Sequence, residues 1–158
     1  LGKLVAFIII GLLTGLLKEI ILFLVFFSGL RLQAGGYHAN TVLTCFLGSL
    51  ALIAIAIFFV RIIPSSYQTL FNFISLVFSL LLVIGFSPSE SENRPLTKEE
   101  RYIYKRRSIL ILVIGSIIVI FLTMKGDKAL YYASIGSMGF LLESFTLINI
   151  SKLRKINS

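Results

Sequence analysis

Long apolar stretches separated by short polar ones dominate the chain. Four of them, at about 41–62, 67–86, 108–124 and 129–150, fit or nearly fit the roughly 20 apolar residues that a membrane-spanning helix needs. A fifth stretch, 4–30, is interrupted by two charged residues, Lys18 and Glu19. It predicts either one tilted helix or two short halves in a re-entrant hairpin. The pattern as a whole predicts an all-α, polytopic transmembrane bundle with about five to six membrane-embedded helical segments.

Turn-forming residues mark the boundaries between these stretches. Gly35-Gly36 followed by Asn40-Thr41 is typical of one helix ending and the next being capped. Pro64-Ser65-Ser66 and Lys125-Gly126-Asp127-Lys128 predict short turns, and residues 87–107 predict one long polar loop. None of these breaks separates two domains, so we expect a single integral-membrane domain over residues 1–158.

Composition narrows the class of protein. Of the 158 residues, 57% are hydrophobic and 14% are charged, whereas soluble domains average about 25% charged residues. This argues against a soluble enzyme and excludes a disordered chain. The net charge of +8 suggests a nucleic-acid partner at first. The aromatic side chains lie inside apolar runs rather than among the basic residues, however, so we expect no nucleic acid and assign the charge to the cytosolic face of a membrane protein.

Basic residues that flank the apolar stretches predict the orientation in the membrane. Six of them lie in the predicted loop at 87–107, namely Arg94, Lys98, Arg101, Lys105, Arg106 and Arg107. A second basic cluster, Lys152, Arg154 and Lys155, falls on the same side when the crossings are counted. We therefore expect a cytosolic loop at 87–107, and the start of the 41–62 stretch at the cytosolic surface. Membrane topology and contact with lipid headgroups are one explanation of these charges. The alternative is that they bind an acidic peptide.

The single His and the single Cys, His38 and Cys45, lie seven residues apart. An imidazole within hydrogen-bond reach can deprotonate a thiol and later protonate a leaving amine. Seven residues of continuous helix rise about 10.5 Å. If the two residues work together, His38 must therefore lie on a loop that folds back, for which Gly35-Gly36 supplies the backbone freedom. With Asn40 or Thr41 as N-cap, Cys45 lies in the first turn or two of a helix, where the dipole favours a thiolate.

Inert roles for both residues remain alternatives. A lone Cys in an apolar helix is usually a small buried hydrophobe, and a lone His near a membrane surface is often only a polar interfacial residue. One Cys and one His are also too few for a structural zinc site, which needs about four ligands, so we predict no metal and no cofactor. On these grounds a non-enzymatic exporter or membrane binding partner is the alternative to an enzyme.

Glu143 lies inside the last apolar stretch, where a carboxylate is costly and is expected to face the bundle interior or water. It either orients a polar partner such as Arg31 or His38, or stays protonated in a helix contact. Asn40, Gln33 and Glu143 are the candidates for a third catalytic residue.

The block Arg31-x-x-Ala-Gly-Gly-Tyr-His-Ala, with Cys45 seven residues after the His, resembles the accessory gene regulator B (AgrB) family. These are membrane cysteine endopeptidases that process the quorum-sensing propeptide AgrD. Pro88, the Asn93-Arg94-Pro95 step, the basic run to Arg107 and Glu143 extend the resemblance over nearly the whole chain. One departure concerns the N-terminal amphipathic portion that the resemblance implies, which we expect to be missing from these 158 residues.

The resemblance implies that Cys45 cuts the propeptide through an acyl-enzyme thioester, with His38 as its base and acid. A Cys or Ser of the peptide then closes a thiolactone or lactone autoinducer. Arg31 and Gly36 match the family's active region, which Gly35, Asn40 and Glu143 support. The implied partners are an AgrD-like propeptide, whose acidic tail docks on the basic residues between 94 and 107, the lipid bilayer, and a second copy in a homodimer.

Overall fold

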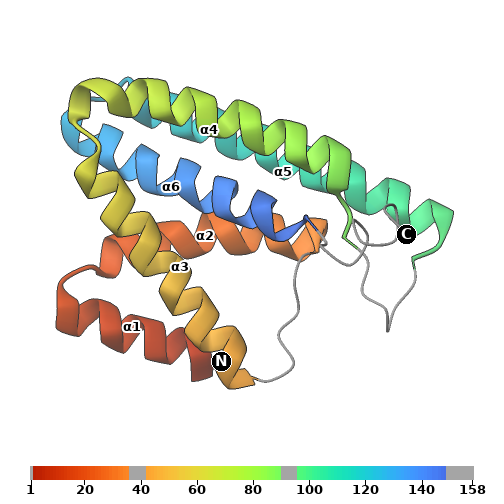
Figure 1. Cartoon of the computed structure of the whole chain (residues 1–158), viewed down its shortest axis with the longest axis horizontal. Coiled ribbons are helices and arrows are strands. Elements are labelled where there is room, and N and C mark those ends of the chain that lie inside the picture. Colours follow the sequence, from red (N-terminus) through yellow and green to blue (C-terminus); the bar gives the residue numbers. More distant parts are fainter. Residues whose placement is uncertain (1, 36–41, 90–95, 149–158) are drawn as a thin grey trace, which may run out of the picture.

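The computed structural model describes residues 2–35, 42–89 and 96–148 (Figure 1). Within these ranges it contains no strand and six α-helices. The helices are α1 (Gly2–Thr14), α2 (Leu17–Ala34), α3 (Val42–Ile62), α4 (Ser65–Phe86), α5 (Lys98–Thr123) and α6 (Asp127–Thr146). The predicted all-α fold class is therefore confirmed.

The central helix of the bundle is α6, which packs against α2, α3, α4 and α5 (Figure 1). Eleven of its 20 residues are buried. Small residues on α6 allow the neighbouring helix α2 to approach it closely. Gly136 lies directly against the ring of Phe26, and Gly139 lies against the backbone carbonyl of Phe23. The helix that carries Glu143 is thus enclosed by most of the other helices.

Three helices, α3, α4 and α5, are long and apolar enough to cross a membrane. Large apolar side chains such as Phe58, Phe73 and Ile117 project from them and are exposed. Such continuous exposed apolar surface is expected where a helix faces lipid rather than water. These features identify a membrane protein. The predicted five to six crossings are only partly shown, because α1, α2 and α6 do not share this length and apolarity.

The stretch 4–30 forms two helices, so the interpretation as one tilted helix is wrong. The chain breaks between α1 and α2 at Gly15, whose φ of +69° lies in the left-handed region that glycine tolerates best. The charged residues Lys18 and Glu19 do not cause the break, since both lie in the first turn of α2. The two helices pack against each other as an antiparallel hairpin (Figure 1). The second half also runs on to Ala34, well beyond its expected end at residue 30.

The predicted loop at 87–107 is shorter than expected, because α5 already begins at Lys98. A capping box starts the helix there. The Thr97 Oγ1 accepts a hydrogen bond from the Glu100 N–H at 3.2 Å, and the Glu100 Oε2 accepts one from the Thr97 N–H at 3.0 Å. Five of the six basic residues assigned to the loop therefore lie on the first turns of α5, namely Lys98, Arg101, Lys105, Arg106 and Arg107. Arg94 lies outside the described residues.

Candidate active site

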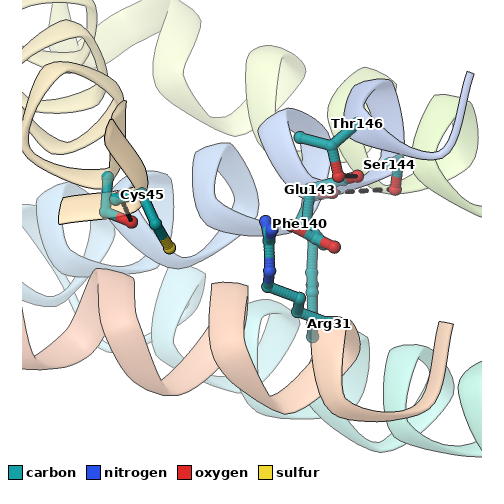
Figure 2. Close-up of polar contacts among 7 residues, drawn as sticks. Arg31, Cys45, Phe140, Glu143, Ser144 and Thr146 are labelled. Atoms are coloured by element: carbon teal, nitrogen blue, oxygen red, sulfur yellow. Dashed lines mark hydrogen bonds and ion pairs between the residues drawn. The ribbon is translucent and has the colours of Figure 1, made fainter. Parts of the chain in front are cut away.

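Cys45 is the fourth residue of α3 and lies in its first turn, as predicted. The residue is half-buried, and its carbonyl accepts a hydrogen bond from the Ser49 Oγ at 2.9 Å. In the view of Figure 2, the thiol points away from α3 toward the Arg31 side chain and α6. The first-turn N–H groups of a helix carry its partial positive charge, so Cys45 lies at the positive end of the α3 dipole.

Gly35 ends α2, with a φ of +77° and its N–H bonded to the Arg31 carbonyl at 3.1 Å. The segment that follows α4 packs onto this helix end, where the Ser89 N–H donates to the Ala34 carbonyl at 2.8 Å. A Cβ on Gly35 would lie 2.6 Å from the Ser89 carbonyl oxygen. Both the backbone angle and the available space therefore require glycine at position 35.

Arg31 and Glu143 form an ion pair between α2 and α6, with 3.3 Å between Nη1 and Oε2 (Figure 2). The Arg31 side chain is 27% exposed and the Glu143 side chain is fully buried. The guanidinium carbon also lies 5.6 Å from the centroid of the Phe27 ring, in a cation–π contact. Of the partners expected for Glu143, the structure shows Arg31 in contact with it. Glu143 lies in the last turn of α6, because that helix ends at Thr146.

Aromatic packing holds the Glu143 carboxylate in place. One turn earlier on α6, the Phe140 ring meets Phe26 of α2 edge to face, with 5.0 Å between the ring centroids. Gly115 of α5 lies directly against the same Phe140 ring. Glu143 Oε1 has no hydrogen-bond partner among the described residues. The carboxyl group is thus enclosed by protein on the α2 and α5 sides and is anchored through Oε2.

Three helix ends bring the candidate residues together. Arg31 is in the last turn of α2, Cys45 is in the first turn of α3, and Glu143 is in the last turn of α6. Figure 2 shows Arg31 beside Glu143, with Cys45 to one side and its thiol directed toward the pair. The first turns of α5, with the basic residues named above, lie at the end of the bundle where α2 and α6 finish (Figure 1).

Several predicted site residues lie outside the described ranges. His38, Gly36 and Asn40 belong to the stretch 36–41, so the pairing of His38 with Cys45 stays a prediction. Among the described residues, no group of three or more His, Cys, Asp or Glu side chains is arranged to hold a metal ion. The cation–π contact between Arg31 and Phe27 was not predicted from the sequence. The spacing of four residues between them on one helix could have indicated it.

Comparison with known proteins decides the family. Residues 1–147 match the family described as accessory gene regulator B. The chain belongs to the AgrB family. The AgrB-like protein of Listeria innocua is 33% identical over 120 residues, and that of Clostridium perfringens is 31% identical over 121 residues.

These alignments cover 73% and 71% of this chain but only 58% and 55% of the two relatives, so the chain spans little more than half of their length. An AgrB-like protein of Listeria monocytogenes is similar to the same extent, at 33% identity over 120 residues. No solved structure gives a significant match. AgrB membership implies a role in the agr quorum-sensing system.

Proposed function

We propose that this AgrB chain is a membrane-embedded cysteine endopeptidase that cuts off the C-terminal part of an AgrD-like propeptide. The observation that carries the proposal is the position of Cys45 in the first turn of α3, with its thiol directed toward the Arg31–Glu143 pair (Figure 2). AgrB membership supports the substrate class.

Cleavage proceeds by attack of the Cys45 thiolate on the scissile carbonyl carbon. His38 takes the thiol proton and then gives it to the leaving amine, so the C–N bond breaks as the C–S bond forms. The products are an acyl thioester on Cys45 and a free C-terminal fragment.

Ring closure follows on the thioester. A thiol or hydroxyl of the bound peptide attacks the acyl carbon, the C–S bond to Cys45 breaks, and the Cys45 sulfur regains a proton. With a peptide thiol, one thioester replaces another, so the exchange changes the free energy little. Exclusion of water from the site would protect the intermediate from hydrolysis, and the half-buried state of Cys45 supports this.

The basic start of α5 is our proposed docking surface for an acidic tail of the propeptide. Its charges, Lys98, Arg101, Lys105, Arg106 and Arg107, gather on one helix end. Tyr102, Arg106 and Arg107 also line a shallow groove there, together with Ile103 and Leu110. The positive-inside rule places this end, and Cys45 with it, at the cytosolic side. The bilayer and a second copy of the chain complete the proposed partners.

Co-expression with an AgrD-like propeptide tests the proposal, with mass spectrometry to detect the trimmed fragment. We expect Cys45→Ala and Cys45→Ser to abolish trimming, because a serine hydroxyl lacks thiolate reactivity without a stronger base. Gly48→Ala, one turn along α3 and beside open space, is the matched control and should trim normally. Trimming that survives Cys45→Ala would remove the peptidase interpretation.

A further inference from the structure

Glu143 has no role in the cleavage steps proposed above, although its side chain is the one acidic group with zero exposure among the described residues. A carboxylate enclosed in a membrane bundle is expensive unless it is paired, and such groups usually serve a function. A buried ion pair is in addition weak evidence for stability, because well-packed apolar residues often replace one without loss. The pair with Arg31 therefore calls for an explanation other than stability.

Contacts with Glu143 and Phe27 help to set the direction of the Arg31 side chain. Its guanidinium is paired with Glu143 Oε2 at 3.3 Å and lies over the Phe27 ring, with 5.6 Å to the centroid. Glu143 sits on α6, the most enclosed helix, whereas the Arg31 side chain is partly exposed. The carboxylate is thus the fixed member of the pair, and in the view of Figure 2 the guanidinium lies between it and the Cys45 thiol.

We propose that Glu143 is a positioning residue that acts through Arg31. It holds the guanidinium on the side of α2 that faces Cys45, where the guanidinium contacts the bound peptide. This inference rests on the proposed peptidase function, since it assigns Arg31 to the peptide that Cys45 cuts. A guanidinium suits this task because it is planar and rigid. Once some of its N–H groups are hydrogen-bonded, the others point in a defined direction.

The test measures trimming of a synthetic propeptide by the purified, membrane-reconstituted protein. Because Cys45 is the only Cys in the chain, titration with a thiol reagent counts the sites to which kcat is normalised. We expect Arg31→Gln and Glu143→Gln each to raise KM about tenfold or more, as expected for a lost hydrogen bond to a charged group, with normalised kcat changed less than about twofold. The double variant should be no worse than Arg31→Gln alone, because both changes remove one interaction.

A merely structural role for Glu143 predicts a different result. Lost stability lowers the number of active molecules and leaves KM unchanged. Ser137→Ala is the matched control, because it removes another buried hydrogen bond of α6, from Ser137 Oγ to Asn72 Oδ1 at 2.8 Å, and should leave KM unchanged. If Glu143→Gln fails to fold, Glu143→Asp keeps the charge on a shorter side chain and should raise KM by a smaller factor.

An unchanged KM in the foldable Glu143 variants, or additive losses in the double variant, would overturn the positioning role. The failure of the two proposals can be told apart. If Cys45→Ala abolishes trimming while Glu143→Gln has no effect on KM, only the positioning role fails. If trimming survives Cys45→Ala, the peptidase function itself fails.

Discussion

Packing of α5 against α6 gives the most direct test of the architecture that holds Glu143. A Cβ added at Gly115 would overlap Cζ of the Phe140 ring and lie 2.5 Å from its Cε2, and Phe140 is 1% exposed. Carbon atoms prefer separations of about 3.5–4.0 Å. The ring cannot swing aside freely, because it meets Phe26 edge to face. We therefore predict that Gly115→Ala destabilises the protein.

The magnitude follows from two opposing effects. Overpacking a core costs about 1–3 kcal/mol, whereas replacing glycine by alanine inside a helix stabilises by about 1 kcal/mol. Gly85→Ala in α4 is the matched control, because nothing lies within 4 Å of the added Cβ and only the stabilising effect remains. The free energies of unfolding of Gly115→Ala and Gly85→Ala should therefore differ by about 1–3 kcal/mol, with Gly115→Ala the less stable.

The assay is unfolding of the protein in mild-detergent micelles by added sodium dodecyl sulfate, followed by circular dichroism. The double variant Gly115→Ala/Phe140→Leu should recover most of the lost stability, because leucine does not reach as far as the phenyl ring. Because Phe140 and Glu143 lie three residues apart on one face of α6, propeptide trimming should fall with Gly115→Ala and recover in the same double variant. Equal stability of Gly115→Ala and Gly85→Ala would refute this account of the packing.

Two further variants test the ends of helices. Thr97→Ala removes the capping box of α5 and should destabilise by about 1 kcal/mol, with faster amide exchange in the first turn; unchanged exchange would contradict the cap. Gly35→Ala forces a side chain to a φ of +77° and into the Ser89 carbonyl, which should lower stability by about 1–2 kcal/mol and reduce trimming. Gly48→Ala serves as control, and equal behaviour of the two glycine variants would show that the end of α2 is not packed as described.

The apolar helices were the most predictable part of the fold. The stretches predicted at 41–62 and 67–86 correspond to α3 and α4, at Val42–Ile62 and Ser65–Phe86. Their ends agree within two residues because turn-forming residues bound continuous apolar runs on both sides, and helix ends are uncertain by that amount in any case. Hydropathy and the flanking turn-forming residues together therefore defined these two helices.

Local backbone chemistry explains the errors. The break at Gly15 is hidden in apolar sequence, so hydropathy pointed to the nearby charges at Lys18 and Glu19 instead. The start of α5 was missed because its charged residues suggested a loop, although Thr97-x-x-Glu100 has the spacing of a capping box. In both places the signal was one or two residues long and was outweighed by the average polarity around it.

The candidate site was predictable as a set of residues and not as an arrangement. Cys45, Gly35, Arg31 and Glu143 all stand out by residue type in unusual surroundings. The contact between Arg31 and Glu143 joins positions 112 residues apart, and no local pattern can choose it over other partners. The rotation of α2 and α6 that aligns the two side chains is set by packing, in particular by Phe140 of α6 against Phe26 of α2.

The order of the helices has a consequence for biosynthesis. The helix at the centre of the bundle, α6, emerges from the ribosome after the four helices that surround it. Its small and polar residues, which include Ser134, Ser137 and Glu143, partition poorly into lipid on their own. Insertion of α6 therefore depends on the neighbours already in the bilayer, and a nascent chain stalled before Asp127 would leave a partly assembled ring of helices for membrane quality-control proteases to degrade.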